Sequence, residues 1–187
     1  MLKEVDAAIK VLQKGGLILY PTDTIWGIGC DATNQKAIKQ IYHLKQREDS
    51  KTMLVLVNSI EMLKEYIREI PSMAPELISL SEKPLTIIYP DAINLAQNLI
   101  NHDGAIGIRI CDTPFCQKLI SLFGKPIVST SANIAGQSYP KTFADIEEPI
   151  LKGVQYIVNM DHTKKNPSSP SSIIKLNLQN EIKIIRE

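Results

Sequence analysis

The chain has 187 residues, a formal net charge of +1 and 44% hydrophobic residues. This length and apolar content suit one globular domain with a buried core, and we expect a single domain over residues 1–187. The balanced charge excludes a generally basic nucleic-acid-binding protein, so positive charge for an anionic ligand must be local. Three cysteines without a Cys-x-x-Cys pair argue against a disulfide framework or a structural zinc site.

Residues 1–14 mix acidic, basic and apolar side chains at helical spacing, unlike the apolar stretch of a signal peptide. Every apolar run is much shorter than the ~20 residues that span a bilayer. We therefore expect a cytosolic protein without a membrane partner.

The periodicity of the apolar residues predicts a series of elements in chain order. A helix over 5–12 leads to a buried strand at 17–20, followed by a polar, glycine-containing loop. Next come a helix at 34–45 capped by Asn34, a strand at 53–57, helices at 59–67 and 75–80, and strands at 85–89 and 105–110. The remaining elements are a helix at 113–124, a strand at 126–130, a helix at 142–151, a strand at 154–158, an exposed loop at 162–172, and strands at 172–176 and 182–186.

Strands alternate with helices over most of the chain, which predicts an α/β architecture. The last two strands are too close in sequence for a helical crossover, so they pair antiparallel and the sheet is mixed. We therefore expect a mixed parallel and antiparallel sheet flanked by helices.

Common catalytic and cofactor-binding motifs are missing from the sequence. It contains no G-x-x-x-x-G-K-[ST] phosphate loop, no G-x-G-x-x-G after a strand and no H-E-x-x-H. We predict surface or packing roles for the three isolated histidines, His43, His102 and His162. No set of side chains is predicted to bind a metal directly.

Two polar clusters follow predicted elements in the first third of the chain. The segment from Pro21 to Thr24, with glycines after it, is either a loop that approaches a ligand or an ordinary polar turn. Lys45, Arg47 and Lys51 converge on one anion only if the preceding helix ends between the first two. Otherwise their charges stabilise the helix C-terminus, with intervening acidic residues neutralising them. The residues alone leave both questions open.

Two further clusters lie in or after later strands. The segment from Ser129 to Asn133 offers hydroxyls and an amide to phosphate or carboxylate oxygens, or forms a simple turn. Arg109 lies within an aliphatic strand, where an unpaired charge is costly. Its partner is a protein carboxylate, such as Asp112 or Glu61, or the carboxylate of a substrate.

Together the clusters resemble the YrdC-like family, the threonylcarbamoyl-AMP synthases. The family hallmark is Lys-x-Arg followed far downstream by Ser-x-Asn, here Lys45-Gln46-Arg47 and Ser131-Ala132-Asn133. Four further stretches match in the same order and extend the resemblance over nearly the whole chain: YPTDTIWGIGCDA at 20–32, GAIGIRI at 104–110, KPIVSTSANIAG at 125–136 and PSSIIKL at 170–176. The closing IIRE places Arg186 where the family has an arginine.

The resemblance implies a twisted mixed sheet with a concave substrate face, related to that of dihydroxybutanone-phosphate synthase. It also implies the conversion of L-threonine, bicarbonate and ATP to threonylcarbamoyl-AMP and pyrophosphate, for N6-threonylcarbamoyladenosine in tRNA. Magnesium would be held mainly through the ATP phosphates, and tRNA or tRNA-modifying proteins would be further partners. The chain looks like the family's short, single-domain form.

Roles follow from the resemblance position by position. Threonine binding is implied for Thr24, Arg109 and Ser129, and ATP binding for Arg47, Lys51, Ser131 and Arg186. Lys45 and Asn133 complete the hallmark, so the implied catalytic group is Lys45, Arg47, Ser131 and Asn133.

Three positions depart from the family pattern. Leu56 replaces a histidine found in some members, Tyr139 replaces a serine, and Lys175 stands where many members have aspartate. The alternatives to the synthase are a non-catalytic RNA-binding module, a diverged paralogue with another substrate and a sugar-phosphate lyase of similar fold. With only 5% aromatic residues, the sequence offers little for base stacking.

Overall fold

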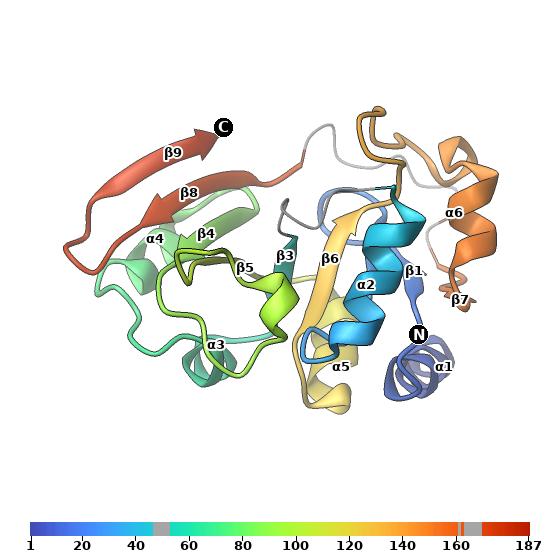
Figure 1. Cartoon of the computed structure of the whole chain (residues 1–187), viewed down its shortest axis with the longest axis horizontal. Coiled ribbons are helices and arrows are strands. Elements are labelled where there is room, and N and C mark those ends of the chain that lie inside the picture. The colour runs from blue at the N-terminus through green and yellow to red at the C-terminus, as the bar shows by residue number, and fades with distance from the viewer. Residues whose placement is uncertain (47–52, 161, 163–169) are drawn as a thin grey trace.

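The computed structural model describes residues 1–46, 53–160, 162 and 170–187. Within these ranges the strands form one mixed sheet with helices packed around it (Figure 1). The helices are α1 (Leu2–Gln13), α2 (Gln35–Leu44), α3 (Ile60–Tyr66), α4 (Ala74–Leu80), α5 (Pro114–Phe123) and α6 (Glu148–Gly153), with 3-10 turns η1 (Gln97–Leu99) and η2 (Phe143–Asp145). The strands are β1 (Ile18–Tyr20), β2 (Gly27–Gly29), β3 (Leu54–Val57), β4 (Leu85–Tyr89), β5 (Ile106–Ile110), β6 (Ile127–Ser131), β7 (Tyr156–Ile157), β8 (Ser172–Leu176) and β9 (Ile182–Arg186).

The strand order is β7-β1-β2-β6-β3-β5-β4-β8-β9. Parallel pairs join β1 to β7, β3 to β5 and β4 to β8, whereas the other neighbours are antiparallel. The predicted α/β architecture with a mixed sheet is confirmed, including the antiparallel pairing of the last two strands.

Local capping chemistry sets the ends of helices α2 and α5. The side chain of Asn34 accepts hydrogen bonds from the N–H groups of Lys36 and Ala37 and so begins α2, as predicted. Thr113 caps α5, and Gly124 ends it in the left-handed conformation at φ 72°. Among the described helices, none has both the length and the apolar character needed to cross a bilayer.

The prediction of a loop through residues 27–29 is wrong, because β2 lies there between β1 and β6. Two of its three residues are glycines, which disfavour strands in sequence-based prediction. The packing explains Gly29: a Cβ atom there would lie 2.8 Å from both the Tyr20 ring and the Val128 carbonyl oxygen.

The single helix predicted over 142–151 is also wrong. The chain forms η2, passes through extended residues at Ile146 and Glu147, and then begins α6 with Pro149 in its first turn. A continuous helix would place Pro149 in the interior, where its ring clashes with an earlier carbonyl. In the loop predicted over 162–172, the described Ser171 is 2% exposed and Ser172 begins β8, so this end is not an exposed loop.

Alternation along the strands separates two buried apolar clusters. Side chains such as Val55, Ile108 and Val128 join the larger cluster with α2 and α3, whereas Leu56 and Ile127 join the cluster beneath α1 and α5. Residues two positions away on the same strands share this second face. Residues at these positions, such as Leu54 and Ser129, line a pocket that α1 and α5 do not cover. The candidate site therefore lies on the uncovered part of this sheet face.

Candidate functional site

A cavity of about 340 Å³ lies on the uncovered face of the sheet. Its size falls in the usual range for small-molecule sites. Alternate residues of the central strands supply its floor, and the loop after β1 and the turn after β6 border it. The lining residues used below are Thr24, Arg109, Ser129, Ser131, Asn133 and Arg186.

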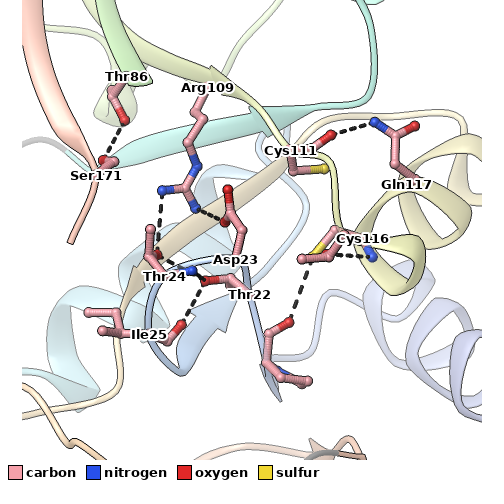
Figure 2. A network of polar contacts seen from close by, with 12 residues as sticks. Thr22, Asp23, Thr24, Ile25, Thr86, Arg109, Cys111, Cys116, Gln117 and Ser171 are labelled. Atoms are coloured by element: carbon pink, nitrogen blue, oxygen red, sulfur yellow. Dashed lines mark hydrogen bonds and ion pairs between the residues drawn. The ribbon is translucent and has the colours of Figure 1, made fainter. Parts of the chain in front are cut away.

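The loop after β1 holds Thr24 against Arg109. The Thr22 hydroxyl donates to the Ile25 carbonyl at 2.7 Å and accepts from the Thr24 N–H at 3.0 Å. The two threonine hydroxyls are 3.0 Å apart. Since the Thr22 proton is already directed to Ile25, Thr24 donates to Thr22 and keeps its lone pairs for Arg109, whose Nη1 lies 3.4 Å away. Figure 2 shows this chain of contacts.

Arg109 is 3% exposed and forms an ion pair with Asp23, with Nη2 2.9 Å from Oδ1. The protein carboxylate is therefore Asp23, from the loop after β1, and neither Asp112 nor Glu61. This contact lacks hydrogen-bond alignment, so the buried Asp23 Oδ1 has no hydrogen-bond partner. The buried Nε of Arg109, which takes no part in this contact, also has none. Burial raises the pKa of the Asp23 carboxyl, while the Arg109 charge opposes that rise. Buried polar atoms are nearly always paired in native structures, so these two atoms, close to the cavity, call for an explanation.

Strand β6 brings the next polar group to the cavity. Ser129 and Ser131 lie on alternate positions of the strand, so both face the cavity, with Ser129 5% exposed. Beyond the strand, the Asn133 amide nitrogen donates to the carbonyls of Ile134 and Gln137 at 2.9 and 2.8 Å. Its Oδ1 is buried without a partner.

Lys45 lies beside this group but is not part of the cavity lining. Helix α2 ends at Leu44, with Lys45 as its C-cap, whereas the predicted convergence required the helix to end between Lys45 and Arg47. The Lys45 side chain is 1% exposed, and its ammonium donates to the main-chain carbonyls of Ser131 and Asn133. Arg47 and Lys51, the other members of the cluster, lie outside the described residues.

Arg186, the last residue of β9, also lines the cavity. Its Nε and Nη2 donate to the Ser171 carbonyl at 3.0 and 2.7 Å, and the Ser171 hydroxyl lies 2.8 Å from that of Thr86. Burial, and then the nearby charge of Arg109, lower the pKa of Arg186. Two guanidinium groups therefore give the cavity a local positive potential despite the balanced overall charge.

Thr86 and Ser171 are functional-site residues that the sequence reasoning missed. Both are nearly fully buried and line the cavity. The signal in the sequence was a single hydroxyl residue within the aliphatic run Leu85-Thr86-Ile87-Ile88, which predicts a polar contact on one face of the strand.

The three departures from the family pattern have different surroundings. Leu56 is fully buried, pairs in register with Arg109 and packs in the cluster beneath α1 and α5. Tyr139 lines the cavity on the side of Arg186. Lys175 forms an ion pair with Asp103 at 2.8 Å, and this bond is the main cause of the lowered Asp103 pKa.

The described residues contain no group of three or more His, Cys, Asp or Glu side chains placed to hold a metal ion. Asn133 lines the cavity, and its neutral Oδ1, which has no hydrogen-bond partner, could serve as one metal ligand. Such a donor set fits a magnesium ion that takes most of its ligands from a bound phosphate chain and water.

The fold and site define an α/β protein with an arginine-bearing pocket, on an open sheet face, for a small anionic ligand. The model of the Sua5/YciO/YrdC family, whose description reads "Telomere recombination", matches residues 10–187. The chain therefore belongs to the Sua5/YciO/YrdC family, and the resemblance inferred from its motifs is confirmed.

Relatives and solved structures agree with this assignment. A protein of Vibrio campbellii named threonylcarbamoyl-AMP synthase is 32% identical over 171 residues, covering 90% of this chain and 92% of the relative. Another of that name, from Pseudoalteromonas translucida, is 31% identical over 172 residues and covers 90% and 91% of the two chains. That name denotes a nucleotidyltransferase.

Two solved structures are close in fold. P. abyssi Sua5 complexed with L-threonine matches with a TM-score of 0.84 and 26% identity over 92% of this chain. The present chain spans 50% of that Sua5 chain. E. coli YciO matches with a TM-score of 0.86 and 23% identity, covering 100% of this chain and 90% of YciO, a likeness in fold.

Proposed function

We propose that this protein is an L-threonylcarbamoyladenylate synthase, which converts L-threonine, bicarbonate and ATP to threonylcarbamoyl-AMP and pyrophosphate. The observation that carries the proposal is the buried Arg109. It lines the cavity, its Nη1 contacts the Thr24 hydroxyl, and its Nε has no hydrogen-bond partner. The names of the Vibrio and Pseudoalteromonas relatives and the L-threonine complex of Sua5 support it.

Arg109, Thr24 and Ser129 form the threonine half of the proposed site. A guanidinium group matches the planar geometry of a carboxylate, so Arg109 binds the carboxylate of threonine. The hydroxyls of Thr24 and Ser129 orient the amino acid beside it. Its neutral amine then attacks CO₂ with release of a proton, or condenses with bicarbonate with release of water, giving a carbamate.

Ser131, Arg186, Arg47 and Lys51 form the ATP half. Their donors and charges hold the phosphate chain while a carbamate oxygen attacks the α-phosphorus and pyrophosphate leaves. Reactions of this kind depend mainly on positioning and charge stabilisation and need no protein nucleophile. Asn133 is the protein residue that would contact magnesium beside the phosphates, and the ion would neutralise part of their charge.

The product is the activated intermediate for N6-threonylcarbamoyladenosine in tRNA. We propose that the protein works in the cytoplasm as a single domain and passes the intermediate to tRNA or to a tRNA-modifying partner protein. Neither role requires a membrane.

The decisive experiment incubates the protein with ATP, magnesium, bicarbonate and labelled threonine and measures pyrophosphate and the labelled mixed anhydride. We expect pyrophosphate release to need both threonine and bicarbonate, because their carbamate is the nucleophile. Equal release without threonine would rule out this reaction, and serine in place of threonine tests specificity for the γ-methyl group.

A further inference from the structure

Among the hallmark residues, Lys45 does not have the position expected of a simple phosphate-binding lysine. An exposed lysine at a helix C-terminus would carry its charge into the solvent or onto a ligand. Here the side chain is turned inward and is 1% exposed. Its ammonium donates to two carbonyls, those of Ser131 and Asn133, which belong to the turn after β6.

The same turn is bound to α2 and β2 by further main-chain contacts. The Ala135 N–H donates to the carbonyl of Lys45 itself at 2.8 Å, and the Ala132 N–H donates to the Trp26 carbonyl at 3.0 Å. The Ser131 position pairs with Gly27 of β2. The turn is thus held by β2 on one side and by the end of α2 on the other, with the Lys45 ammonium as the charged part of that contact.

We infer that Lys45 is a positioning residue, which fixes the main chain of residues 131–133 and does not contact the triphosphate. Drawing the two carbonyls onto a buried ammonium leaves the Ser131 side chain directed at the cavity. The two halves of the family hallmark are then one physical unit, in which Lys45 holds the segment that carries Ser131 and Asn133. The position of Lys45 is independent of the proposed function. Only the identity of the ligand that Ser131 and Asn133 bind rests on it.

The first test observes the ammonium of the unaltered protein by NMR with ¹⁵N-labelled lysine. We expect a slowly exchanging Lys45 NH₃⁺ signal with couplings through hydrogen bonds to the carbonyls of Ser131 and Asn133. Both couplings should persist when magnesium and a non-hydrolysable ATP analogue are added. A signal that loses them and couples to phosphorus instead would overturn the inference.

The second test separates charge from hydrogen bonding with two variants. Lys45→Met keeps the length of the side chain but removes its donors, whereas Lys45→Gln is neutral and retains an NH₂ group that donates to carbonyls. A displaced turn costs about 100-fold in turnover, so we expect that loss for Lys45→Met. Lys45→Gln should recover about tenfold of it through a remaining hydrogen bond. Equal losses in both variants would contradict a role for hydrogen bonds to the carbonyls, and the salt dependence of binding separates carbonyl from phosphate contacts.

The salt dependence of the affinity for an ATP analogue reports how many protein charges contact the phosphates. A general loss of structure does not change it in the same way. Since Lys45 does not face the phosphates, Lys45→Gln should show the same salt dependence of affinity as the unaltered protein. A weaker dependence would show that a charge on the phosphates has been removed, and would contradict the inference. Lys39→Met, on the exposed face of α2, is the matched control and should leave turnover unchanged.

These measurements stand apart from the reaction itself. If the unaltered protein releases no pyrophosphate with threonine, the proposed function fails. The NMR couplings still decide the role of Lys45. If Lys45→Met does not fold, the NMR experiment and Lys45→Gln carry the test.

Discussion

Arg109 combines burial with incomplete pairing, and this combination sets the chemistry of the site. A carboxylate of the protein lies 2.9 Å away, yet the Nε of Arg109 and the nearer carboxylate oxygen lack aligned hydrogen bonds. A buried charge with unfilled donors is stabilised when a ligand carboxylate supplies the missing acceptors. The affinity for the amino acid should therefore depend on the shape of this side chain as well as on its charge.

Arg109→Lys tests that dependence. Lysine keeps the charge but cannot make two parallel hydrogen bonds to one carboxylate. We expect threonine affinity to fall by about 1.5–3 kcal/mol, or roughly 10- to 150-fold, with little change in ATP affinity. Calorimetry with each ligand measures this, and Arg68→Lys, at an exposed position, is the control. Unchanged threonine affinity in a folded Arg109→Lys variant would exclude the carboxylate contact.

At the level of elements, periodicity and capping residues predicted most of the fold. Asn34 and Thr113 cap helices as expected, because a cap is a local interaction between near neighbours in sequence. Strand β2 was missed because glycine disfavours strands, and the reason for Gly29 is a close approach to Tyr20 and Val128 that only the folded sheet creates. The inward turn of Lys45 was missed because it, too, depends on contacts that only folding creates. Of the candidate site, the motifs contain Thr24, Arg109, Ser129, Ser131, Asn133 and Arg186, which the fold brings to one cavity, but they did not reveal the Asp23–Arg109 pair or the Thr86–Ser171 contact.

The close packing of β2 predicts a contrast between two glycines. In Gly29→Ala the new methyl group would lie 2.8 Å from a main-chain oxygen that cannot move freely, and we expect a loss of about 1–3 kcal/mol in the free energy of unfolding. In Gly107→Ala the nearest atom is 3.4 Å away, which is ordinary contact. That variant should be as stable as the unaltered protein or about 0.4–1 kcal/mol more stable. Urea denaturation of both variants checks the prediction, and equal destabilisation would contradict it.

The contact between α1 and the end of β7 predicts a dependence on pH. The Glu4 carboxylate accepts hydrogen bonds from the Asn159 N–H and the Tyr156 hydroxyl, both at 2.7 Å, and these bonds lower its pKa. Because the folded pKa is below the unfolded one, the stabilisation is present above the unfolded value and is lost as pH falls through the folded value.

Glu4→Gln should therefore melt below the unaltered protein at pH 7, and the difference should shrink as the pH falls below about 4. Thermal denaturation across this range measures it. Glu61→Gln, on α3 and away from this contact, is the control. A difference that stays constant down to acid pH would show that the carboxylate charge contributes nothing here.

At the scale of the whole molecule, elements far apart in sequence line one cavity. Thr24 follows β1, Arg109 and Ser129 lie on β5 and β6, and Arg186 lies on β9, the last strand in sequence. A ligand that binds only the folded protein stabilises it by an amount that grows with the logarithm of the ratio of ligand concentration to dissociation constant, and the melting temperature rises accordingly. The two proposed substrates can thus be followed separately on the intact protein.

Removal of magnesium should affect one of these ligands and not the other. At a concentration 100 times its dissociation constant, each ligand should raise the melting temperature by roughly 5–10 °C. EDTA should sharply reduce the rise given by ATP and abolish turnover, because the phosphates lose their counter-charge, while the rise given by threonine stays the same. Differential scanning fluorimetry makes the comparison. A threonine effect that also vanishes with EDTA would place the metal at the amino-acid half instead.

The sheet order has a consequence for how the protein is made. Thr24 follows the first strand, whereas Arg186 lies on β9, the last strand in sequence, and both line one cavity. Synthesis proceeds from the N-terminus at about 5–20 residues per second, so the threonine half emerges from the ribosome well before Arg186 does. On the proposed function, a nascent chain lacks one of the four ATP-binding residues until β9 has paired with β8. Chains that end before and after β9 should therefore differ more in ATP affinity than in threonine affinity.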